Sequence, residues 1–209
     1  MKGLKVLMAL AAAFGFAFAQ SNPLMQVFFP PDEHLKQACD EGYKSGETND
    51  LSELFKGLRY VFIAQASEPA DRVDIETPLA LVFAQCRDQA KALKPKSYPS
   101  PVWKGLVRVF LSGKVYELSS AKDWALALSI RAGNNEIARI LPAQKVLADT
   151  RLWKVDCSGS RCVWKGKNLY IFDLNGQEEA IKQADGLVIL YQAGRGIKQI
   201  PVPIEEIRR

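Results

Sequence analysis

The chain has 209 residues, 48% of them hydrophobic, and a formal net charge of +5 at pH 7. This length is ample for a hydrophobic core and suits one larger domain or two small ones. The modest charge does not by itself imply a polyanionic partner, and the single histidine excludes any site that needs two histidines from this chain.

The N-terminal segment has the three parts of a secretory signal peptide. Lys2 and Lys5 precede an apolar run, which ends in a small-x-small pattern at residues 17–19, before Gln20. We therefore predict a signal peptide over 1–19, export to the periplasm or the cell surface, and no transmembrane segment after cleavage. The alternative is an uncleaved anchor, although the apolar run is shorter than the ~20 residues of a spanning helix.

Residues 20–96 are predicted to form a helical module. Apolar residues repeat with a helical period in three segments, which are the stretch that begins at Asp32 and the stretches after the capping signals Asp50 and Thr77. Asp50 is followed three residues later by an acid, as in a capping box, and Thr77 precedes a proline at the first helical position. We expect helices over 32–44, 51–62 and 78–93.

Residues 97–209 are predicted to form a mainly antiparallel β-sandwich or barrel. The proline-rich segment 94–101 breaks both periodicities, so we place the boundary between residues 96 and 97. Turn signals at short intervals favour antiparallel strands over βαβ units. The expected strands are 106–111 and 115–118 around a Ser112-Gly113 turn, 123–131 and 136–141 around a second turn, 187–191 as a central strand, and an edge strand or extended tail at Pro201 and Pro203. The predicted fold class is α+β.

The stretch around Trp153 resembles one known kind of module. It runs Trp153-Lys154-Val155-Asp156, then Gly159, then Val163-Trp164. This succession of strand, turn and tryptophan-bearing strand resembles the immunoglobulin-like modules of bacterial envelope proteins. The resemblance implies a sandwich fold for the C-terminal half and implies no activity.

The four cysteines predict disulfide bonds, because an even number in an exported chain is typical of them. Three pairings are open on sequence alone. Cys39 and Cys86 lie on the apolar faces of two predicted helices, so packing of those faces would bring them together. Cys157 and Cys162 flank four residues, and a hairpin would place them opposite each other, with Val155 opposite Trp164 and Trp153 opposite Gly166.

Neither a metal site nor a redox site fits the cysteine spacing. Zinc sites combine close cysteine pairs or cysteines with histidines, and His34 is the one histidine here. Redox cysteines occur as C-x-x-C at a helix start, whereas Cys157 and Cys162 have four residues between them. We expect no metal and no cofactor.

Catalytic motifs are absent from the sequence. His34 lies between two acids in a predicted first helical turn, which is typical of a solvated surface residue. Phosphate-binding, zinc-protease and hydrolase signatures do not occur. We expect a protein without its own catalysis, although an acid-based enzyme would leave few traces in a sequence.

One predicted surface carries an excess of basic side chains. In the hairpin register above, Lys154 lies directly opposite Lys165, with Arg161 and Lys167 nearby and only Asp156 to offset them. Like charges in that position are unfavourable. The face is either a solvated strand surface or a contact for an anionic partner. That partner would be an envelope polymer, an acidic protein or the helical module of the same chain, and not nucleic acid.

Charge is also uneven between the two predicted modules. Residues 20–96 carry nine basic and twelve acidic side chains, whereas residues 97–209 carry seventeen and eleven. We therefore expect an exported, non-enzymatic envelope protein that acts by protein or polymer interaction through the basic hairpin face. The alternatives are a periplasmic hydrolase of envelope polymers and a small-ligand binder in the cleft between the modules.

Overall fold

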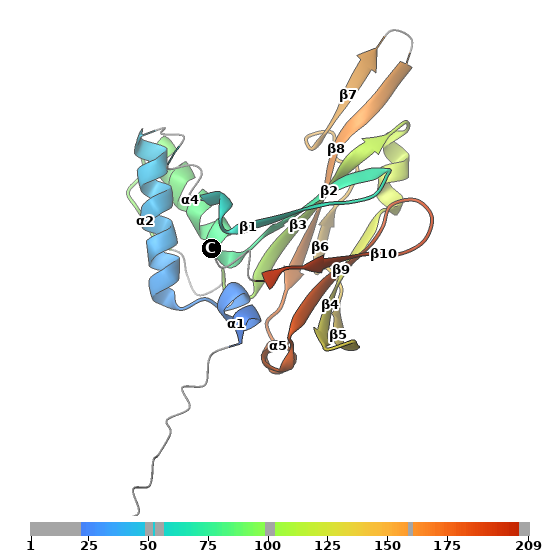
Figure 1. Ribbon diagram of the computed structural model, residues 1–209. Coiled ribbons are helices and arrows are strands. Elements are labelled where there is room, and N and C mark those ends of the chain that lie inside the picture. The colour runs from blue at the N-terminus through green and yellow to red at the C-terminus, as the bar shows by residue number, and fades with distance from the viewer. Residues whose placement is uncertain (1–21, 49–51, 53–56, 99–102, 159–160, 205–209) are drawn as a thin grey trace, which may run out of the picture.

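The computed structural model describes residues 22–48, 52, 57–98, 103–158 and 161–204. A small N-terminal helical part is followed by two antiparallel sheets, so the α+β fold class is confirmed (Figure 1). The predicted signal peptide, residues 1–19, lies outside the described residues. No described helix has both the length and the apolar character that a membrane crossing requires.

The helical part contains α1 (Pro23–Phe28), α2 (Asp32–Thr48) and α4 (Pro78–Lys91). The predicted cap at Thr77 is confirmed, since its hydroxyl accepts a hydrogen bond from the Ala80 N–H. Asn22 caps α1 in the same way, accepting from the Leu24 N–H. The packing of α2 against α4 buries the Cys39 and Cys86 side chains, which form a disulfide bond as predicted.

The six-stranded sheet has the order β1-β2-β3-β8-β6, and β7 pairs with another stretch of β8. Its strands are β1 (Val61–Gln65), β2 (Ala70–Glu76), β3 (Leu106–Val115), β6 (Gln144–Val146), β7 (Trp153–Ser158) and β8 (Arg161–Asp173). The four-stranded sheet has the order β10-β9-β4-β5. Its strands are β4 (Ala125–Ala132), β5 (Asn135–Ile140), β9 (Gly186–Gln192) and β10 (Lys198–Val202). The 3-10 helix η2 (Leu118–Asp123) and the short helix α5 (Glu178–Gln183) connect the two sheets.

The inner faces of both sheets contribute to one hydrophobic cluster, as in a β-sandwich. Trp124 from one side and Trp153 from the other meet edge to face, with ring centroids 5.5 Å apart. Helix α1 closes the cluster with Leu24, Val27 and Phe28. A second, smaller cluster lies between α2 and α4.

Several strand predictions are confirmed. β4 and β5 form the expected hairpin, β9 lies inside its sheet, and Pro201 lies in the edge strand β10. An edge position suits proline because its missing N–H is not needed by a neighbouring strand.

Two local predictions are wrong. Phe62, predicted to end a helical repeat, lies in β1, where its side chain is buried. The strands β1 and β2 pair antiparallel with each other, and β2 also pairs with β3. The expected turn at Ser112-Gly113 is interior to β3, which runs unbroken. Gly113 serves close packing there instead, since a Cβ would lie 2.3 Å from the Pro69 carbonyl oxygen. The module boundary between residues 96 and 97 stays a prediction. The strand β2, which precedes this boundary in the chain, pairs with β3, which follows it.

Candidate functional site

The β7–β8 hairpin has the register that the sequence predicts. Val155 lies opposite Trp164, Trp153 opposite Gly166 and Cys157 opposite Cys162, and the two cysteines are bonded. The hairpin extends beyond the rest of the sandwich (Figure 1). Only its base is covered, because Trp153 is fully buried whereas Val155, on the same face, is 54% exposed.

Three lysines form a row across three neighbouring strands, and we call Lys114, Lys154 and Lys165 the lysine row. Lys165 of β8 lies opposite Lys154 of β7, as predicted, and on its other side opposite Lys114 of β3. All three side chains are exposed. Adjacent strands are about 4.8 Å apart, so three like charges stand in line on one outer surface.

Sequence reasoning missed Lys114. The predicted turn at Ser112-Gly113 leaves it between the expected strands 106–111 and 115–118, so no register against β8 follows from the sequence. The signal that was available is the alternation of Val107, Val109 and Leu111, which continues without interruption to Val115.

One carboxylate partly neutralises the row. Asp156 of β7 forms an ion pair with Lys165, and the hydrogen bond from that lysine, with the charges of Lys165 and Lys114, lowers the pKa of Asp156. Lys154 donates instead to the Thr150 carbonyl oxygen at 3.3 Å. Asp156 is the one carboxylate in the described residues that forms an ion pair with the row.

The other two predicted basic residues have different surroundings. The Lys167 Nζ atom lies 3.8 Å from the centroid of the Phe110 ring, so this lysine covers an aromatic side chain on the outer face of the sheet. Arg161 is exposed near the tip of the hairpin, opposite Ser158 and next to Cys162. The lysine row, rather than all four predicted residues, therefore forms the continuous basic surface.

A hollow of about 440 Å³ adjoins the lysine row and shares Lys114 with it. It is lined by Glu68, Pro69, Asp71, Lys114, Val115, Tyr116 and Val163. The walls thus combine two carboxylates, one ammonium group, apolar side chains and the ring of Tyr116, which is 82% exposed.

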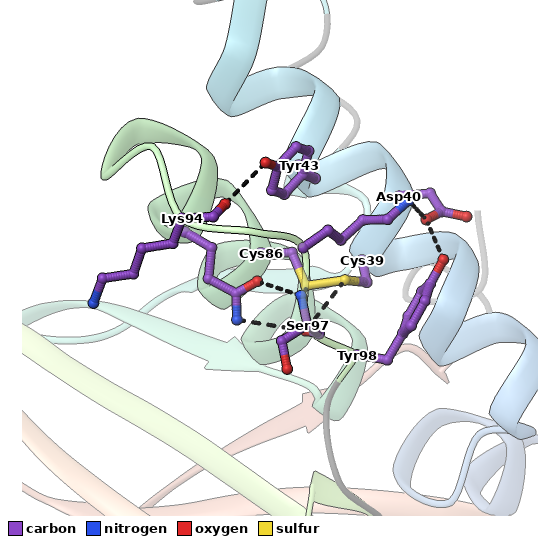
Figure 2. The surroundings of a disulfide bond; sticks show 9 residues. Cys39, Asp40, Tyr43, Cys86, Lys94, Ser97 and Tyr98 are labelled. Carbon is purple, nitrogen blue, oxygen red and sulfur yellow. Dashed lines mark hydrogen bonds and ion pairs between the residues drawn. A yellow bond between two sulfur atoms is a disulfide. The ribbon is translucent and has the colours of Figure 1, made fainter.

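The second disulfide lies in a different environment. Figure 2 shows residues 94–98 crossing over the Cys39–Cys86 bond. The Ser97 carbonyl oxygen lies 3.9 and 3.8 Å from the two sulfur atoms, and Asp40 accepts hydrogen bonds from Lys96 at 2.7 Å and Tyr98 at 3.0 Å. The hydrogen bond from Lys96 lowers the pKa of Asp40. The Cys39–Cys86 disulfide is fully buried under these contacts and holds α2 against α4.

Side chains that could together hold a metal ion are not gathered in the part of the chain described. His34 is exposed on α2, and no three His, Cys, Asp or Glu side chains converge among the described residues. A second hollow of about 670 Å³ is lined by residues of α2, α4 and the segment that follows α4. Neither hollow has walls from both the helical pair and the sheets.

Comparisons with known proteins give no relatives for this chain. No protein family model, no curated protein sequence and no solved structure matches it.

Proposed function

We propose that this chain is an exported, non-catalytic protein of the cell envelope that attaches to an anionic partner through the lysine row. The observation that carries the proposal is the direct alignment of Lys114, Lys165 and Lys154 across three strands. Directly opposed like charges on neighbouring strands destabilise a sheet. Carboxylate or phosphate groups of a partner would relieve that repulsion and gain contacts with all three ammonium groups.

The rigidity of the hairpin supports this role. The Cys157–Cys162 bond fixes the register of β7 on β8, and β8 pairs with β3 over ten residue pairs, so the backbone positions of the three lysines are fixed relative to one another. A preorganised surface binds with a smaller loss of conformational entropy than a flexible one. Export is supported by the two disulfides, because such bonds persist in oxidising compartments.

The test is a co-sedimentation assay with isolated envelope material and with polyglutamate, at low and high salt. The triple variant Lys114→Gln, Lys154→Gln and Lys165→Gln should lose most of the attachment. Rising salt should weaken attachment of the unaltered protein, because exposed charges are screened beyond ~8 Å at physiological ionic strength.

The matched control is the triple variant Lys36→Gln, Lys122→Gln and Lys145→Gln, which removes the same charge at exposed sites outside the lysine row. It should sediment like the unaltered protein. Equal loss in both triple variants would mean that only net charge matters, and equal sedimentation of all three proteins at low salt would reject the lysine row as a binding surface.

A further inference from the structure

We propose that the hollow beside the lysine row receives the basic side chain of a peptide whose acidic side chains contact the row. The inference rests on the proposed function, since it identifies the partner of the same surface as a polypeptide carrying both charges. It follows from the charges, the shape and the rigidity of the hollow.

The turn that carries Glu68 directly precedes β2, which carries Asp71, and three neighbouring segments hold this turn in place. The Pro69 carbonyl oxygen accepts from the Lys114 N–H at 3.0 Å, and the Tyr191 hydroxyl accepts from the Ser67 N–H at 2.8 Å. Lys198 donates to the backbone oxygens of Ser67 and Glu68 at 3.4 and 3.0 Å. Residues 67–69 are therefore fixed against β3, β9 and β10, and the hollow is preformed.

The charges around the hollow do not neutralise one another. Glu68 and Asp71 are exposed, and within the described residues neither forms an ion pair with Lys114 or with any other basic group. The Lys198 ammonium group is engaged by backbone oxygens and Lys114 belongs to the row, so the carboxylates of Glu68 and Asp71 are the charges in this wall that remain open to a partner's cation. A purely anionic chain would be attracted by the row and repelled by the hollow, so the complementary partner carries a cation beside its anions.

The walls of the hollow suit the side chain of lysine or arginine. Pro69, Val163 and the ring of Tyr116 offer apolar surface for the methylene stem, while Glu68 and Asp71 offer oxygen atoms to the charged end. An exposed tyrosine ring also attracts a cation placed over its face. A polysaccharide amine, which lacks such a stem, would leave this apolar surface uncovered.

The spacing sets the pattern expected in the peptide. In an extended chain, side chains on the same side recur at alternate residues, about 6.7 Å apart. The lysine row extends away from Lys114, which it shares with the hollow, in steps of about 4.8 Å. The two spacings differ by about 2 Å, which the long side chains of lysine and glutamate can span, so a basic residue followed by acids at alternate positions can place its cation in the hollow and its carboxylates near the row.

The experiment uses the full mature chain and two dye-labelled heptapeptides with blocked ends, measured by fluorescence anisotropy. One peptide has a lysine followed by two glutamates at alternate positions among glycines, and the other has norleucine in place of the lysine. We expect the lysine peptide to bind about fivefold more tightly, as one or two exposed ion pairs would give. The double variant Glu68→Gln and Asp71→Asn should abolish this difference and bind the norleucine peptide more tightly than the unaltered protein does.

The control double variant, Glu33→Gln and Asp123→Asn, removes the same charge from exposed positions elsewhere and should keep the preference for lysine. Equal binding of the two peptides by the unaltered protein, with polyglutamate still bound, would overturn the inference and leave the proposed function standing. Failure of polyglutamate and both peptides to bind would reject the proposed function itself. A glucosamine polymer is tested as a competitor of the bound lysine peptide. If it displaces that peptide as effectively as the norleucine peptide does, the assignment to a peptide is overturned.

Discussion

Asn168 and Tyr170 are buried polar side chains on β8, and each one fastens the strand to neighbouring segments. The Asn168 Oδ1 atom accepts from the Ala148 N–H and the Trp153 ring N–H, and its Nδ2 atom donates to the Ala121 carbonyl oxygen. The Tyr170 hydroxyl donates to the Trp124 carbonyl oxygen at 2.8 Å. Every polar atom of these side chains thus has a partner, which burial demands.

Tyr170 should make the protein less stable at alkaline pH. Burial raises the pKa of Tyr170 to about 12, whereas the same phenol titrates near 10 in an unfolded chain. The stabilisation is fully present below pH 10 and is lost as the pH rises from about 10 to 12, because the unfolded chain loses its proton first. The total loss is on the order of 2–3 kcal/mol. Urea unfolding at several pH values should therefore show a steeper decline in the unaltered protein than in Tyr170→Phe, and parallel curves would contradict this account.

At the scale of elements, two glycines of α2 allow it to approach α4 closely. A Cβ at Gly42 would lie 2.2 Å from the Phe83 carbonyl oxygen, and one at Gly46 would lie 2.4 Å from the Arg87 carbonyl oxygen. Cys39 lies on the same face, one turn before Gly42, and its Cα atom is 5.2 Å from that of Cys86. The small side chains therefore bring the two cysteines within bonding distance.

Gly42→Ala should destabilise the protein even though alanine favours helices. The gain in helix propensity is at most about 1 kcal/mol, whereas forcing an extra methyl group into a packed contact costs about 1–3 kcal/mol. A net loss of about 1–2 kcal/mol is expected in urea unfolding. Gln37→Ala, on the exposed side of α2, should change stability by less than about 0.5 kcal/mol. If Gly42→Ala were instead more stable than the unaltered protein, α4 would have to move away from the added methyl group without a loss of stability.

The two disulfides should differ in their accessibility to reductant. Cys157 and Cys162 are exposed on the hairpin, whereas Cys39 and Cys86 are fully buried beneath residues 94–98. Thiol attack on a disulfide requires access to a sulfur atom. Brief treatment with a mild thiol, followed by alkylation and peptide mass mapping, should label Cys157 and Cys162 first. Labelling of all four cysteines at the same rate would mean that residues 94–98 do not protect the helical bond.

At the scale of the whole molecule, the sequence predicts local pairs well and assembly poorly. The β7–β8 register follows from a short cysteine loop, and the cap at Thr77 follows from a single dipeptide, so both depend on neighbours in the chain. The pairing of β2 with β3 joins segments more than thirty residues apart, and no local pattern encodes it. The same limit hid the third lysine, because Lys114 meets Lys165 only once β3 and β8 are paired.

The pairing of β2 with β3 argues that residues 97–209 do not fold alone. Without the preceding segment, β3 would lose its β2 neighbour, and the core would lose Val73, Ile75 and the apolar face of α1, all of which are buried in the sandwich cluster. Exposing the edge of β3 would also leave a row of unpaired backbone groups open to aggregation.

A fragment of residues 97–209 should therefore bind a hydrophobic dye and unfold without a cooperative transition. Mixing it with the disulfide-bonded fragment 20–96 should restore a single transition, because β2 and α1 regain their places in the cluster. The measurement is near-ultraviolet circular dichroism of each fragment and of the mixture, with the intact chain as the reference. Two folded fragments whose summed spectra match that of the intact chain would show that the boundary between residues 96 and 97 separates independent domains.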